Sequence, residues 1–94
     1  MPRALNEQEI AEALRPLSGW TCQDGRIALT REFETYAAGV LFANVAAALA
    51  ETMDHHPDLA IGYRRVTVSL FTHSVGGVTD LDLEYARRLA ALGL

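Results

Sequence analysis

The chain has 94 residues, of which 50% are apolar and 21% are charged, and its formal net charge is −4 at pH 7. This length predicts one domain, spanning 1–94, with a single hydrophobic core, and no apolar run approaches the roughly 20 residues of a membrane span. The acidic balance excludes direct nucleic-acid binding, because that function needs a basic stripe facing the phosphates.

The first expected element is a helix that begins after Asn6. Asn6 is a suitable N-cap, and Glu9 completes a capping-box pattern. Pro16 and Gly19 mark the end of this helix. The segment before it lacks the basic and apolar regions of a secretory signal, so a cytoplasmic location is expected. Four apolar residues share one helical face: Ile10, Ala13, Leu14 and Leu17.

From Ser18 the apolar residues alternate with polar ones, which is typical of strands. Trp20 and Cys22 share one side of the first strand, and Asp24-Gly25 predicts a type I′ turn into a second strand. The lone Cys22 excludes an internal disulfide framework, and we interpret it as a packed apolar residue without a catalytic role.

Thr35 is the expected cap of a second, longer helix. Pro57 cannot continue a helix and restricts His56 to an extended conformation, so this helix is expected to end near Asp54 or His55. Apolar spacings of three and four predict its apolar face: Tyr36, Val40, Leu41, Val45, Ala48, Leu49 and Met53.

The segment 59–73 has strand character, with Val66, Val68 and Leu70 on one side. Its length exceeds that of a usual strand, so we divide it at Arg64-Arg65 into a second hairpin. After a loop at 76–77, Thr79 and Asp82 form another capping-box pattern. The last helix is expected to end at Gly93. Its expected apolar face consists of Leu81, Tyr85, Leu89 and Leu92.

This element order, α-β-β-α-β-β-α, predicts an α+β fold in two layers, a four-stranded antiparallel sheet with helices on one face. Such a sheet leaves one face and two edges uncovered. Pairing of edges or burial of a face between copies is the economical remedy, so a homodimer or homotetramer is expected.

Three histidines stand at two element ends: His55 and His56 after the second helix, and His73 after the last strand. If the hairpins lie side by side, these imidazoles converge, and imidazoles suit proton transfer near neutral pH. Four carboxylates are candidates to orient the rings: Glu51, Asp54, Asp58 and Asp82.

Two other interpretations of the histidines stay open. A histidine at the end of a helix often only donates hydrogen bonds to the last carbonyls and interacts favourably with the helix dipole. Three histidines can also hold zinc. The chain has no HExxH pattern, however, and the adjacent His55 and His56 point in different directions, so we predict no metal.

The full pattern resembles the pterin-4a-carbinolamine dehydratase family, also known as dimerisation cofactors of a homeodomain transcription factor. The similarity covers nearly the whole chain, including Trp20 and the 33–36 region. Its signature residues here are Glu51, His55-His56-Pro57, Tyr63, Thr72-His73 and Asp82.

The resemblance implies a hydro-lyase that dehydrates 4a-hydroxytetrahydropterin to quinonoid dihydropterin in tetrahydropterin recycling, without a metal or an organic cofactor. It implies that His55, His56 and His73 are catalytic. It also implies a pterin site that those histidines share with Pro57, Thr72, Ser74 and Val75, supported by Glu51, Asp54 and Asp82.

The chain departs from frequent family residues at Asn44, Leu59 and Val75, which bears on substrate fit. Some relatives act as partner-binding factors, such as transcription-factor dimer stabilisers or assembly factors. A protein-binding or coactivator module without enzymatic activity is therefore the alternative function.

Overall fold

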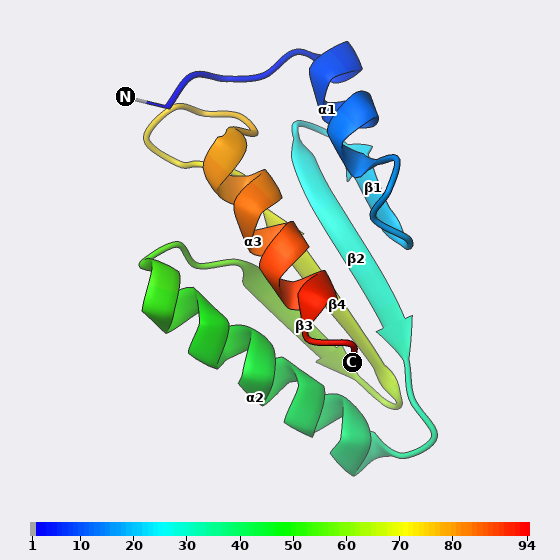
Figure 1. The fold of residues 1–94 in the computed structure, drawn as a ribbon. Helices are drawn as coiled ribbons and strands as arrows, with labels where there is room; N and C mark the ends of the chain where they lie inside the picture. The colour runs from blue at the N-terminus through cyan, green and yellow to red at the C-terminus, as the bar shows by residue number, and fades with distance from the viewer. Residues whose placement is uncertain (1) are drawn as a thin grey trace.

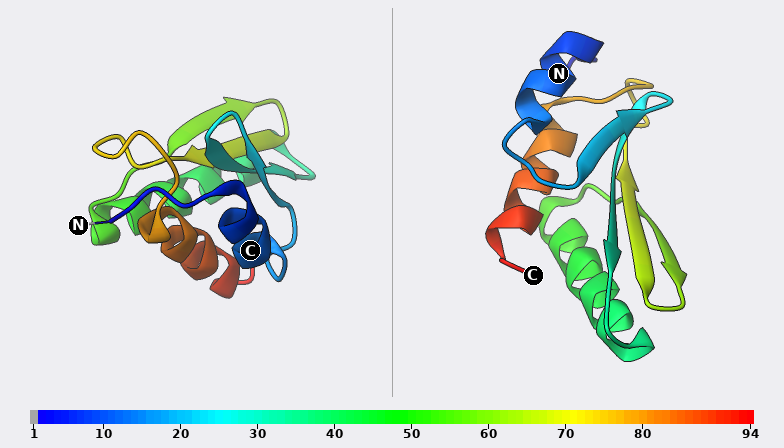
Figure 2. Two further views of the ribbon diagram at one scale, coloured as in Figure 1. Left: turned by 90° about the horizontal axis from the view of Figure 1, so that it is seen from above. Right: turned by 90° about the vertical axis from the view of Figure 1, so that its right-hand side faces the viewer.

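A computed structural model describes residues 2–94. The strands form one antiparallel sheet in the order β1-β2-β4-β3, and the helices cover one of its faces (Figures 1 and 2). This arrangement confirms the predicted α+β fold. In chain order the elements are α1 (Glu7–Leu14), β1 (Trp20–Gln23), β2 (Arg26–Glu32), α2 (Tyr36–Met53), β3 (Asp58–Gly62), β4 (Arg65–Leu70) and α3 (Asp80–Ala91).

The predicted capping box starts α1. The Asn6 side chain accepts from the Glu9 backbone N–H at 2.8 Å, and the Glu9 carboxylate accepts from the Asn6 N–H at 3.0 Å. The same carboxylate also accepts two bonds from the Arg3 guanidinium. The hydrogen bond from Arg3, followed by that from the Asn6 backbone, lowers the pKa of Glu9 to about 2. The amino-terminal segment is thus fastened to the helix that it precedes.

Both hairpins use two-residue turns. Asp24 and Gly25 have φ angles of 54° and 76°, the left-handed pair that a type I′ turn requires. The second turn lies at Tyr63-Arg64, one residue earlier than predicted. Arg64 adopts φ 60° there, and its Nε donates to the Phe33 carbonyl while its own carbonyl accepts from the Phe33 N–H. These bonds hold the turn without glycine or asparagine.

The packing of α2 differs from the prediction. Leu41 is 66% exposed and Tyr36 is 54% exposed, although both belong to the predicted apolar face. A Cβ on Gly39 would lie 3.4 Å from Val66 Cγ2, so small side chains let α2 approach the sheet closely. The face that is buried against the sheet is Gly39, Phe42, Ala43, Ala46 and Ala50.

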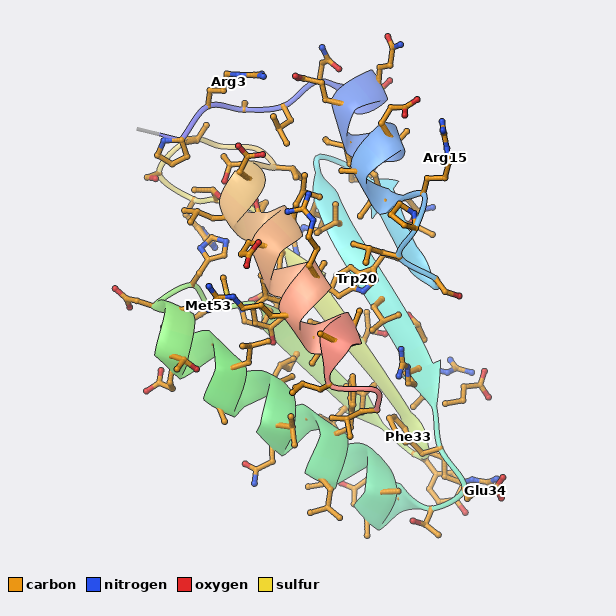
Figure 3. The ribbon with its side chains drawn as sticks, viewed as in Figure 1. Arg3, Arg15, Trp20, Phe33, Glu34 and Met53 are labelled. Carbon is orange, nitrogen blue, oxygen red and sulfur yellow. The ribbon has the colours of Figure 1, made fainter. Side chains whose placement is uncertain are left out.

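By length and composition alone, α2 could also cross a membrane, since its 18 residues have a mean hydropathy of 1.3. This corrects the expectation that no run approaches a membrane span. One side of α2 belongs to the core beneath the sheet, so packing explains the apolar residues of that side, whereas Tyr36 and Leu41 on the other side are exposed. Figure 3 shows Phe33 where the chain leaves β2 for α2, and Met53 at the other end of that helix.

Three further packing predictions need correction. Cys22 is exposed rather than packed, because β1 is an edge strand of the sheet. On α3, Leu81 and Leu92 are exposed, whereas Tyr85 and Leu89 are buried as predicted. Leu83, which the helical pattern did not single out, takes a core position instead.

Candidate active site

The end of α2 sets the position of the histidine pair. Asp54 adopts the left-handed conformation, with φ 50°, and its N–H bonds the carbonyls of the last helical turn. This left-handed residue and Pro57 turn the chain away from the helix axis. In the views of Figures 1 and 2, the loop from 71 to 79 lies on the side of the molecule where α2 ends.

His55 points into the protein toward α3. Its Nε2 lies 2.6 Å from Oδ1 of Asp82, and the two side chains are 12% and 0% exposed. A fully buried carboxylate needs hydrogen-bond partners, because burying an unpaired charge is costly. His55 supplies one of these partners, so the predicted role of Asp82 as an orienting group fits this geometry.

Asp82 also accepts two other hydrogen bonds, both on Oδ2. The Thr72 hydroxyl donates at 2.9 Å and the Thr79 N–H donates at 2.8 Å. Thr79 Oγ1 accepts from the Leu81 N–H and lies 2.7 Å from the Thr72 hydroxyl. Since the Thr72 proton goes to Asp82, the Thr79 hydroxyl must donate to Thr72. The buried polar groups therefore form one satisfied chain.

These hydrogen bonds bear on the tautomer of His55. Asp82 accepts on Oδ2 from both Thr72 and Thr79, as a carboxylate does. With Oδ1 as an acceptor too, the proton of the 2.6 Å bond belongs to Nε2 of His55. In a neutral ring this leaves Nδ1 with a free lone pair, and in a charged ring it leaves an Nδ1–H. Nδ1 can therefore accept or deliver a proton.

His56 has a separate carboxylate partner. Its Nε2 lies 2.5 Å from Oε2 of Glu51, and the side chains are 54% and 77% exposed. Glu51 is one of the predicted orienting carboxylates, and beyond the left-handed cap at Asp54 it is His56, not His55, that contacts it. At such exposure the pair contributes little stability, so its effect is on the orientation of the ring.

His73 is exposed and follows Thr72 directly in the loop between β4 and α3. Its ring centroid lies 4.2 Å from that of Phe71, with an interplanar angle of 37°. Within residues 2–94 no side chain forms a hydrogen bond with this ring. Because Thr72 binds Asp82, the backbone at His73 is tied to the same buried carboxylate as His55.

The other predicted residues fall into two groups. Asp54 is an exposed cap, and Asp58 bonds Arg26 at 3.2 Å, so neither contacts an imidazole. Pro57, Ser74 and Val75 flank the histidines in sequence: Ser74 is exposed, whereas Pro57 and Val75 are half-buried.

The turn after β4 is tight, since the N–H groups of Val75 and Gly76 both bond the Thr72 carbonyl. Thr79 joins the polar chain, a role that its capping-box spacing to Asp82 could have indicated. Among residues 2–94, no three His, Cys, Asp or Glu side chains are grouped so that they could hold a metal ion.

The fold and this site define a small α+β protein in which a buried carboxylate supports one of three histidines near the end of the sheet. The sequence model of the family described as pterin 4 alpha carbinolamine dehydratase matches residues 3–92, and the chain belongs to that family. The predicted resemblance is therefore confirmed.

Relatives match over almost their whole length. A Metallosphaera sedula protein, assigned by its name to the pterin-4-alpha-carbinolamine dehydratases, is 44% identical over 92 residues, covering 98% of this chain and 95% of that protein. A Brucella ovis protein with the same assignment is 47% identical over 90 residues, covering 94% and 93%.

Two solved structures have the same fold. The Brucella melitensis protein described as a transcriptional coactivator/pterin dehydratase has a TM-score of 0.87 and 41% identity, covering 96% of this chain and 98% of its own. A pterin dehydratase-like RuBisCO assembly factor of the alpha-carboxysome has a TM-score of 0.61 and 24% identity, covering 78% and 84%. The latter likeness concerns the fold alone.

Proposed function

We propose that this protein dehydrates 4a-hydroxytetrahydropterin to quinonoid dihydropterin and water by histidine acid–base catalysis. The observation that carries the proposal is the buried Asp82 carboxylate, which holds Nε2–H of His55 and leaves Nδ1 to exchange protons. Family membership supports the substrate class. A cytoplasmic location and a role in tetrahydropterin recycling are part of the same proposal.

The reaction needs two proton transfers and no redox partner. The C4a–O bond breaks as the departing hydroxyl receives a proton and leaves as water. The N5–H proton goes to a base, and its electron pair forms the N5–C4a double bond. We assign the donor to His55, because Asp82 compensates the charge of its imidazolium form in the way that a carboxylate supports a triad histidine.

The remaining imidazoles supply the base and hold the pterin. His56 and His73 are both exposed and thus accessible to a substrate, and each contacts one neighbouring side chain, Glu51 or Phe71. Pro57 and the 72–75 backbone are the proposed walls of the pterin site. This mechanism requires no metal or organic cofactor, since imidazoles perform both transfers.

Stopped-flow absorbance on a 4a-hydroxytetrahydropterin, generated by a tetrahydropterin-dependent hydroxylase, tests this function. The wild-type protein should accelerate dehydration well above the buffer rate. His73→Ala should lose about 100-fold or more in kcat, the contribution of a positioned acid or base. Arg87→Ala, an exposed change on α3, is the control. Wild-type protein that leaves the buffer rate unchanged would reject the proposal.

We also propose that the protein is a homo-oligomer that buries the exposed face of α2. Tyr36 and Leu41 are more than half exposed, and Leu41, Val45 and Leu94 line a largely apolar hollow beside them. Large apolar side chains grouped on a surface mark an association site. Light scattering at micromolar concentration should give a dimer or tetramer mass, and Leu41→Glu should give a monomer. A monomeric wild type would contradict this.

A protein-binding module is the second candidate function. The same α2 face favours it, as does the description of the Brucella melitensis relative as a transcriptional coactivator/pterin dehydratase. Under this alternative, a pull-down with mass spectrometry should recover a stable hetero-complex that Leu41→Glu abolishes. Failure to recover such a complex, together with dehydratase activity, would favour the enzyme.

A further inference from the structure

We infer that Arg26 and Phe71 are positioning residues for His73, an inference that rests on the proposed function of that imidazole. Neither residue belongs to the histidine–carboxylate groups described above. They reach His73 from the sheet surface that the helices leave uncovered. The sheet itself would thereby orient a ring that has no hydrogen-bonded side chain among residues 2–94.

The register of the sheet brings the two residues together. Ile27 on β2 pairs with Leu70 on β4, so the next step of this antiparallel ladder places Arg26 opposite Phe71. Ile27 and Leu70 are buried on the helix side. Because side chains alternate along a strand, Arg26 and Phe71 lie on the other side. The guanidinium carbon of Arg26 lies 4.7 Å from the Phe71 ring centroid.

Two more strands hold the guanidinium in place. Its Nη1 donates to Asp58 on β3 at 3.2 Å and to Ser69 on β4 at 3.1 Å. Asp58 and Ser69 are themselves paired in the β3–β4 ladder. A planar group bonded from two neighbouring strands has little freedom to rotate, so it presents a fixed cationic surface to Phe71.

Contact with Phe71 restricts the rotamers of the His73 ring. The two ring centroids are 4.2 Å apart, so the Phe71 and His73 rings are in direct contact. Without this contact, an exposed imidazole in a loop would sample several rotamers. Proton transfer needs a ring held in one geometry, since a small misplacement can lower a rate by up to about 100-fold. The stack therefore serves the reaction through His73.

Arg26→Met is the most informative variant, because it removes the cation but leaves both rings in place. Arg31→Met is the matched control, since Arg31 is also on β2 and lies 5.5 Å over a different ring, that of Phe42. Phe71→Leu removes the aromatic ring, whereas Phe71→Tyr keeps one at the same position. Thermal unfolding of each variant identifies any loss of fold.

The first readout is the NMR resonance of the His73 ring protons. In the wild type these should be shifted upfield by the Phe71 ring current, and the shift should shrink in Arg26→Met but not in Arg31→Met. The second is kinetic: Arg26→Met and Phe71→Leu should lower kcat about 10-fold with little change in KM. Phe71→Tyr and Arg31→Met should keep the wild-type kcat.

Two results would overturn the inference: unshifted His73 resonances in the wild type, or an unchanged kcat in both Arg26→Met and Phe71→Leu when the wild type is active. A wild type without dehydratase activity would instead reject the proposed function. In that case the comparison of Arg26→Met with Arg31→Met still decides whether the stack orders His73.

Discussion

Replacing Asp82 by asparagine changes the charge of the buried carboxylate while keeping its size. The Oδ2 position receives two donors, from Thr72 and Thr79, so the amide oxygen of asparagine should occupy it. The amide NH2 then faces Nε2 of His55, where the present separation is 2.6 Å. Two donors cannot face each other, so His55 must move its proton to Nδ1.

The effect on kcat should be large. A neutral His55 in the wrong tautomer offers Nδ1–H without a carboxylate to compensate the charged form. General acid–base groups contribute roughly 100- to 10,000-fold, so Asp82→Asn should lower kcat by at least about 100-fold. Loss of one charge-assisted bond in a buried site should lower the free energy of unfolding by about 1–3 kcal/mol.

Stopped-flow dehydration measures the kinetic effect, and urea denaturation measures the stability. Nitrogen NMR of the imidazole reports the tautomer of His55 directly. Asp80→Asn is the control, because Asp80 is an exposed residue in the same helical turn. A variant Asp82→Asn with wild-type kcat would refute the reasoning, whatever its stability.

Three further predictions concern other parts of the molecule. Glu51→Gln should change the free energy of unfolding by less than about 0.5 kcal/mol, because the pair with His56 is exposed. It should nevertheless alter kcat or KM. Unchanged kinetics would show that Glu51 has no role in the reaction. Burial raises the pKa of Tyr85 to about 12. The neutral phenol therefore adds stability below pH 10 that is lost as pH rises toward 12, by up to about 1.4 kcal/mol per unit. Tyr85→Phe should remove this alkaline loss. At pH 7 it should lower the free energy of unfolding by about 1 kcal/mol, because the hydrogen bond to the Ala46 carbonyl is lost. Urea denaturation at pH 7 and at alkaline pH measures both effects, and an equal alkaline loss of stability in wild type and Tyr85→Phe would contradict the prediction. Gly19→Ala should lower the free energy of unfolding by about 1–3 kcal/mol, because Gly19 has φ 88° and an added Cβ would lie 2.9 Å from Leu29 Cδ1. An unchanged free energy of unfolding in urea denaturation would contradict this prediction.

Local signals in the sequence predicted the fold well. The capping boxes at Asn6 and Thr79 and the type I′ turn at Asp24-Gly25 depend on neighbouring residues, and the structure has all three. The alternation of Val66, Val68 and Leu70 identified the buried side of β4 for the same reason. Where the determinant is within a few residues, periodicity and capping chemistry suffice.

Tertiary determinants were harder to predict. The helix α2 is apolar on two sides, and only the close approach that Gly39 permits shows why its small residues face the sheet. Beyond the left-handed cap at Asp54, Glu51 contacts His56 rather than His55. The contact of Arg26 with Phe71 depends on the β2–β4 register, which joins segments far apart in the chain.

The proton-donor role of His55 is the central claim, and chemical rescue tests it most directly. In the stopped-flow assay, His55→Ala should lose about 100-fold or more in kcat, and added imidazole should restore part of it by acting beside Asp82. The same imidazole should not accelerate Asp80→Asn. A His55→Ala variant that dehydrates the pterin carbinolamine at the wild-type rate would contradict the claim.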